Sequence, residues 1–294
     1  MTRFSSFAAI DWSGAKGPRQ KGIAIALCHR DDAVPKLVFP DSQTSGSKVW
    51  SRDDVLRWLL HALPKNTLVG LDLSPGLPFE DHLAYFPGWE LSPPDAKSLW
   101  RLVDEIAKED PHLAATSFVR HTEARRHFRH AKGDCGDLFE AGTGRLRETE
   151  KRQKLLRLAP SSCFNLIGAA QVGKSSLTGM RVLHRLDGAL PVWPYDDLPD
   201  SGSAIVEIYT SLAAREAKLP PGRAKMTDRA ALQRALDTFS LPEHLPLDRY
   251  TDHATDAILT AAWLRRAADR AELWQPEALT LNIARTEGWT FGVI

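Results

Sequence analysis

The segment Ala8-Ala9-Ile10-Asp11-Trp12-Ser13-Gly14 is an apolar run that stops at an aspartate, and Leu68-Val69-Gly70-Leu71-Asp72-Leu73-Ser74 repeats this pattern further along the chain. Short aliphatic runs of this kind are typical of buried strands. Because each run ends in an acid, each strand is expected to carry a carboxylate to the edge of a sheet. The two segments therefore predict neighbouring central strands with Asp11 and Asp72 at their ends.

The other patterns predict an α/β fold around these strands. Residues 6–13, 21–30 and 36–43 read as strands joined by short connections, as in an antiparallel meander. Ser51 with Asp54 predicts the start of a helix, which Pro64 ends. Further strands are expected at 67–74 and 204–209, helices at 95–110, 146–158, 227–236 and 252–271, and a closing hairpin from 279–284 and 289–294.

A long interruption separates the strand at 67–74 from the strand at 204–209. It begins at Ser74-Pro75-Gly76-Leu77-Pro78, which breaks the regular pattern. We expect one domain over 1–294, with a mainly helical subdomain inserted at about 75–202. Near its end, residues 191–199 are expected to form a loop, because three prolines interrupt either kind of hydrogen-bonded ladder.

Composition indicates an ordinary globular protein, with 294 residues, 43% of them hydrophobic and 26% charged. The net charge of +1 gives no overall attraction to nucleic acid or membrane. No apolar run approaches the roughly 20 residues of a membrane-spanning helix, so no membrane association is expected. Three cysteines without a Cys-x-x-Cys pair, and an N-terminus without a signal-type apolar core, predict a cytoplasmic location.

The element order matches the ribonuclease H-like fold, and the chain resembles the predicted-nuclease family known as domain of unknown function 429. The segments that carry the resemblance are Ile10-Asp11-Trp12-Ser13-Gly14-Ala15, Gly70-Leu71-Asp72-Leu73-Ser74-Pro75-Gly76-Leu77-Pro78, Phe164-Asn165-Leu166-Ile167-Gly168 with Val172-Gly173, Val206-Glu207-Ile208-Tyr209 and Asp256-Ala257-Ile258-Leu259-Thr260-Ala261-Ala262. They are spread over nearly the whole chain. The resemblance implies a mixed five-stranded sheet flanked by helices, with a long insertion after the fourth strand.

The resemblance also implies a metal-dependent nuclease. Asp11, Asp72 and Asp256 match the acids that in such enzymes hold two Mg²⁺ or Mn²⁺ ions for phosphodiester hydrolysis. Some resolvases of this fold carry an acid or a histidine three residues before the final aspartate, and His253 has that spacing. Asp252 is offset by one residue, so the fourth site residue is either of the two.

The residues themselves leave other interpretations open. An aspartate at a strand end can cap a turn, and an acid in the first turn of a helix suits the helix dipole. Glu207 lies between Val206 and Ile208, so alternation turns it to the opposite face. On that face it would either join the metal ligands or point to solvent. The coincidence of Asp11, Asp72 and Asp256 in one fold order favours the metal site.

Residues Gly168-Ala169-Ala170-Gln171-Val172-Gly173-Lys174-Ser175 match the phosphate-loop pattern. Lys174 and Ser175 are therefore candidate nucleotide ligands. The context disfavours a phosphate loop, since the segment before it is too short and irregular for a buried strand. A nucleotide-binding or phosphotransfer protein is nevertheless the first alternative function, and a non-catalytic binding protein of the same fold is the second.

Residues 120–157 carry eleven Lys or Arg against six Asp or Glu. Phosphate contacts by such side chains give affinity without sequence preference. A nucleic-acid partner is therefore expected to contact Arg125, Arg126, Arg129 and Lys132. The other interpretation is a solvated surface whose charge is balanced by acids elsewhere.

Overall fold

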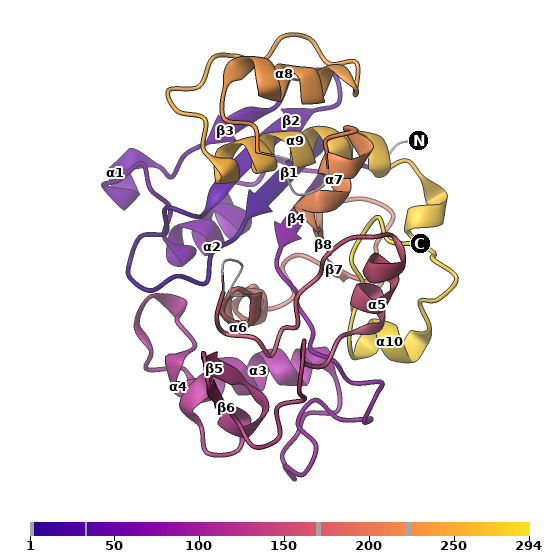
Figure 1. Cartoon of the computed structure of the whole chain (residues 1–294). Coiled ribbons are helices and arrows are strands. Elements are labelled where there is room, and N and C mark those ends of the chain that lie inside the picture. The colour runs from indigo at the N-terminus through magenta and orange to yellow at the C-terminus, as the bar shows by residue number, and fades with distance from the viewer. Residues whose placement is uncertain (1–2, 33, 169–171, 221–224) are drawn as a thin grey trace.

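The computed structural model describes residues 3–32, 34–168, 172–220 and 225–294. Its centre is a mixed sheet with strand order β3-β2-β1-β4-β8-β7 (Figure 1). Strand β2 runs antiparallel to β1 and β3, whereas β1, β4, β8 and β7 are parallel to one another. The strand bounds are β1 Ser6–Asp11, β2 Ala24–His29, β3 Lys36–Val38, β4 Thr67–Asp72, β7 Val192–Trp193 and β8 Ala204–Glu207.

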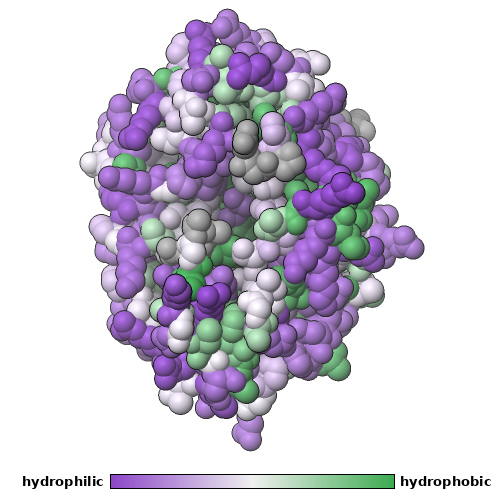
Figure 2. Space-filling model, viewed as in Figure 1, coloured by the Kyte–Doolittle hydropathy of each residue, from purple (hydrophilic) through white to green (hydrophobic). Residues whose placement is uncertain are grey.

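Both faces of β1 are covered, as a continuous apolar run in a central strand requires. Ala8 and Ile10 belong to one hydrophobic cluster, while Phe7 and Ala9 belong to a second cluster on the opposite face. This alternation follows from the two-residue period of a strand. The predicted central strands are therefore confirmed. The face of the molecule seen in Figure 2 is mostly hydrophilic, with smaller apolar patches.

Helices cover the two faces of the sheet. On the second-cluster side, α9 (Asp252–Ala267) packs on β1 and β2 and is flanked by α7 (Thr210–Glu216) and α8 (Arg229–Asp237). On the other side lie α2 (Arg52–His61), α3 (Ala96–Ile106) and α6 (Val172–Arg185). No helix of the described residues is long and apolar enough to cross a bilayer.

The first long helix begins where the sequence predicts. The Ser51 hydroxyl accepts a hydrogen bond from the Asp54 amide at 3.0 Å, and the Asp54 carboxylate accepts one from the Ser51 amide at 3.2 Å. This reciprocal capping box satisfies two amides that have no partner inside the helix. A short helix, α1 (Ser42–Ser45), precedes it.

Most of the regular secondary structure between β4 and β8 is helical. This stretch contains α3, α4 (Thr116–Arg120), α5 (Glu148–Leu155) and α6, with a small two-stranded sheet of β5 (Arg129–Ala131) and β6 (Asp134–Cys135). Figure 1 shows α3, α4, β5 and β6 at the end of the molecule opposite α8, with α6 between them and the main sheet.

The main sheet has six strands, so the predicted five-stranded sheet is wrong by one edge strand. The extra strand, β7, lies within the proline-rich segment that the sequence predicts as loop. Only Val192 and Trp193 pair, opposite Ile205 and Val206. Prolines are tolerated there because they flank a two-residue strand at the sheet edge, where one side of the ladder is unused.

The predicted closing hairpin is also wrong. Residues Leu281–Arg285 form a short helix, α10, whose start is capped by the Thr280 hydroxyl accepting from the Ile283 amide at 3.2 Å. The final segment instead reaches β8, where Thr290 forms an isolated bridge with Glu207. A five-residue apolar pattern fits both a strand and a helix turn, and the cap selects the helix.

Candidate active site

Two of the predicted site residues lie side by side at one edge of the sheet. Asp11 and Asp72 are the last residues of β1 and β4, and they are partners in the parallel register. Neighbouring strands are about 4.8 Å apart, so their carboxylates are held at short range. Asp11 is buried, with 7% of its surface exposed, and Asp72 is partly buried. The carboxyl ends of parallel strands are where α/β sheets commonly place their ligand sites.

The third acid arrives from the helix that covers these strands. Asp256 lies on α9, which packs against β1, β2 and β4. A cavity of about 270 Å³ opens at this point. Its acidic and histidine lining consists of Asp11, Asp72, Glu150, Glu207, Asp252, His253 and Asp256. The structure thus brings the three predicted acids to one cavity.

The carboxyl groups hold their protons more tightly than isolated acids do. Burial, and then the charges of Asp11, Asp256 and Glu207, raise the pKa of Asp72 well above its ordinary value. Burial followed by repulsion from Asp11 raises the pKa of Asp256 from 3.8 to about 7. Like charges that share a desolvated site disfavour full ionisation. Ionising all of these acids together is therefore unfavourable unless a positive charge lies close to them.

His253 contacts one of these acids. Its Nδ1 lies 3.2 Å from Asp11 Oδ2. This hydrogen bond raises the pKa of His253, while burial, the largest effect on Asp11, raises the pKa of that acid. Asp252 also lines the cavity, but its carboxylate forms an ion pair with Lys225 at 2.6 Å. Of the two candidates for the fourth position, His253 is the one in contact with a site acid.

Glu207 lines the same cavity but is already engaged. Both of its oxygens accept hydrogen bonds from the Arg147 guanidinium, at 2.8 and 2.6 Å, and Thr290 Oγ1 donates to it at 2.7 Å. Arg147 is fully buried and also binds Glu150, at 3.0 Å. Glu207 therefore points neither to solvent nor freely into the cavity, and we leave it out of the proposed ligands.

Arg147 could not be identified from any sequence pattern. It stands just before α5 in the insertion, far along the chain from Glu207, and no motif marks the pair. Only the folded chain shows that a buried guanidinium is shared by two of the acids at this cavity.

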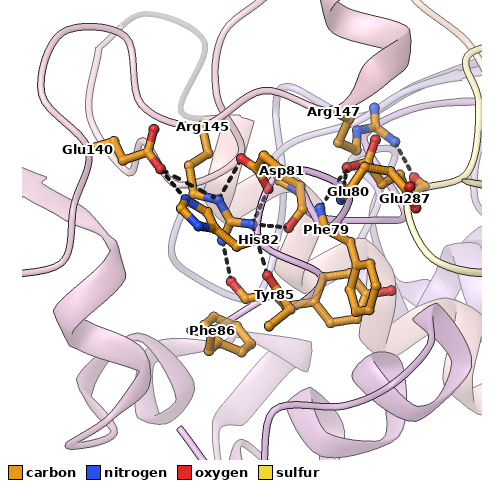
Figure 3. Close-up of polar contacts among 12 residues, drawn as sticks. Phe79, Glu80, Asp81, His82, Tyr85, Phe86, Glu140, Arg145, Arg147 and Glu287 are labelled. Atoms are coloured by element: carbon orange, nitrogen blue, oxygen red, sulfur yellow. Dashed lines mark hydrogen bonds and ion pairs between the residues drawn. The ribbon is translucent and has the colours of Figure 1, made fainter. Parts of the chain in front are cut away.

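One other cluster could hold a cation. Asp81, His82 and Glu140 are the only group of three in the described residues whose His, Cys, Asp or Glu ligand atoms all lie within 4.8 Å of one another. The site acids around Asp11 are thus spread more widely than a single ion would need. Figure 3 shows that Arg145 binds Asp81, with Nε to Oδ2 at 2.9 Å, while His82 contacts Glu140 at 2.7 Å. The exposed cluster is already satisfied internally.

Comparisons of the chain with known protein families, with curated proteins and with solved structures found no match. The geometry described above must therefore carry the functional argument by itself. The resemblance to the predicted-nuclease family stays a prediction.

The centre of the phosphate-loop pattern, residues 169–171, lies outside the described residues. The described residues before it, 160–168, form no strand of the main sheet, whereas a phosphate loop follows such a strand. Lys174 and Ser175 lie in the first turn of α6, and burial, then Lys16, lower the pKa of Lys174. Ser175 lines the acid cavity, but its hydroxyl accepts a hydrogen bond from the Gly14 amide at 3.2 Å. Nothing in these contacts tests nucleotide binding.

The predicted phosphate-contacting surface lies in the insertion, apart from the acid cavity. None of Arg125, Arg126, Arg129 and Lys132 lines that cavity. Arg126 is paired with Asp137 at 2.7 Å and with Glu123 at 3.2 Å. Part of the predicted positive charge is thus neutralised locally, and a nucleic-acid contact at these residues stays a prediction.

Proposed function

We propose that the protein is a metal-dependent nuclease of ribonuclease H-like fold that hydrolyses phosphodiester bonds by a two-metal mechanism. The observation that carries the proposal is the convergence of Asp11, Asp72 and Asp256 on one cavity. The strand order β3-β2-β1-β4-β8, with β2 antiparallel to its neighbours, supports the fold assignment. In such a fold the acids of the first strand, the fourth strand and the last helix form the site.

The donor atoms fit Mg²⁺ or Mn²⁺, because hard carboxylate oxygens are the ligands these ions prefer. Burial, and then repulsion between the acids, raise the pKa values of Asp72 and Asp256, so a cation bound here would favour their ionised forms. Asp11, Asp72 and Asp256 would hold the ions. Bound divalent cations supply an activated water and stabilise the leaving 3′ oxygen. Carboxylates that bind two different ions need not all lie within bonding distance of one ion. The wider spacing of these acids is therefore compatible with two ions.

The chain's own side chains prepare this site. His253 holds Asp11 through its Nδ1 and keeps a proton beside that carboxylate. Arg147 binds both Glu207 and Glu150 and offsets part of their negative charge. The cavity wall is completed by Ser175 and by Tyr209, which follows β8. Together these contacts orient one set of acids and neutralise the other.

The test is cleavage of single-stranded, duplex, hybrid and branched nucleic acids with Mg²⁺ or Mn²⁺. Asp11→Asn should lower the rate by at least roughly a hundredfold, because even indirect partners of metal ligands typically contribute about 10- to 100-fold. Asp31→Asn, a matched change at an exposed aspartate outside the cavity, should leave the rate unchanged. Activity that survives Asp11→Asn would refute the proposal.

A further inference from the structure

A second and larger cavity, of about 650 Å³, adjoins the acid cavity. We call it the lateral groove. It is lined by β3 and the residue after it, by residues 48–50, and by residues 245–249 on the segment that leads into α9. His253 lines both cavities. A ligand chain that leaves the acid site past His253 therefore enters the lateral groove.

The lateral groove is positively charged although the whole protein is nearly neutral. Its lining includes four cationic side chains, Lys21, Lys36, Lys48 and Arg249, against the single acid Asp248. Lys36 is paired with Asp32 at 2.6 Å. The other three cations are exposed and form no side-chain hydrogen bond or ion pair with any described residue. Three cations without a side-chain partner among the described residues thus line a groove next to the cavity that we propose binds a phosphodiester.

The groove also has an apolar wall. Phe39 and Leu245, which are 56% and 60% exposed, both line this groove and place apolar surface beside its cations. Trp50 forms part of the lining and is fixed by its indole Nε1–H, which donates to the Val38 carbonyl at 3.1 Å. Cations beside aromatic surface are the combination that binds unpaired nucleotides, with phosphates on the cations and bases on the apolar wall. The bases of a duplex are stacked inside the helix, so only its sugar-phosphate exterior could contact this wall.

We propose that the lateral groove binds a single-stranded segment of nucleic acid that continues from the scissile phosphate in the acid cavity. This inference rests on the proposed nuclease function and specifies its substrate class. Lys21, Lys48 and Arg249 contact successive phosphates, and Phe39 stacks on a base.

The test measures binding of fluorescently labelled oligothymidylate in EDTA, with a duplex of the same length beside it. The variant replaces Lys21, Lys48 and Arg249 by glutamine. It should bind the single strand at least about tenfold more weakly, and the slope of log affinity against log salt should become shallower by about 2, at about 0.7 for each lost contact. Phe39→Ala should weaken binding without changing that slope, because stacking releases no counterions.

A matched control neutralises two lysines and one arginine outside the groove, with Lys65, Arg101 and Lys108 changed to glutamine. This control should bind like the wild type. All three substituted sets are at exposed positions, and equal melting temperatures check that the variants fold. Unchanged affinity and salt slope in the groove variant, or equally tight binding of the duplex, would overturn the inference.

Hydrolysis of bis(p-nitrophenyl) phosphate with Mn²⁺ separates the two proposals, because this small diester needs only the acid cavity. If the wild type hydrolyses it in an Asp11-dependent way yet binds no oligonucleotide, the groove inference fails and the proposed chemistry stands. If the groove binds single strands while Asp11→Asn leaves diester hydrolysis unchanged, the proposed function fails and the groove assignment stands. Loss of diester hydrolysis in the groove variant would also contradict a role in nucleotide binding alone.

Discussion

Replacing Asp256 by asparagine should stabilise the metal-free protein at neutral and alkaline pH. In the folded chain the Asp256 carboxyl has a pKa of about 7, raised from 3.8 by burial and by repulsion from Asp11 and Asp252, while His253 and Lys225 oppose the shift. Ionising it in the fold therefore costs more than ionising it in the unfolded chain. Asparagine has nearly the same shape and carries no charge, so it removes this cost.

The size of the effect follows from the pKa. A shift of about 3 units, at about 1.36 kcal/mol each, sets an upper limit near 4 kcal/mol. Asp256 is partly exposed, so solvent screening reduces this, and we expect about 1–2 kcal/mol. The folded protein binds more protons than the unfolded chain between pH 3.8 and about 7, so this contribution lowers stability as pH rises through that window. Below the window both states are protonated and the contribution vanishes.

The assay is urea unfolding in EDTA, followed by tryptophan fluorescence near pH 4 and near pH 8. The difference between Asp256→Asn and wild type should be close to zero at the acidic pH and favour the variant at the alkaline pH. Asp31→Asn is the control, since it is exposed and should show no such change. Saturating Mn²⁺ should shift the comparison toward the wild type, because the variant keeps only two of the three proposed ligand acids and binds the ion more weakly. A variant that is less stable than wild type in EDTA near pH 8 would refute the reasoning.

Two further substitutions test how the site is supported. Arg147→Met leaves Glu207 buried without its cation, so the free energy of unfolding should fall by about 3–5 kcal/mol; adding Glu207→Gln should recover part of that loss, and no recovery would contradict the ion-pair explanation. Gly14→Ala places a methyl group 2.4 Å from the Ser175 amide nitrogen, so α6 must move from the cavity edge. Both the melting temperature and the nuclease activity should drop. An unchanged melting temperature would contradict this expectation, because it would show that α6 can shift without a loss of stability.

Local patterns were sufficient for the elements that present the site. The runs ending in Asp11 and Asp72 predict buried strands, and the parallel register places their last residues opposite each other. The helix expected from residue 252 begins at Asp252, with Thr251 as its cap. That Asp256 meets the two strand acids was implied only by the family resemblance, because no local pattern relates a late helix to the first strand.

Other features could not be predicted because their causes are tertiary. Helix α6 was missed since Gly173, Ser175, Ser176 and Gly179 are weak helix formers, and packing against α3 supports the helix instead. Strand β7 pairs through two residues, too few for any periodicity to appear.

Two classes of acid line the cavity, and they differ in whether a cationic side chain binds them. Glu207 and Glu150 are bound by the buried guanidinium of Arg147, and their role can be fulfilled without any ligand. Asp72 and Asp256 have no comparable partner in the described structure, although their burial makes ionisation costly. A fold that needed these aspartates only for packing would gain stability by losing their charge. Two partly buried aspartates without a paired cation among the described residues, beside two glutamates that share one, are the physical reason to look for a cation there.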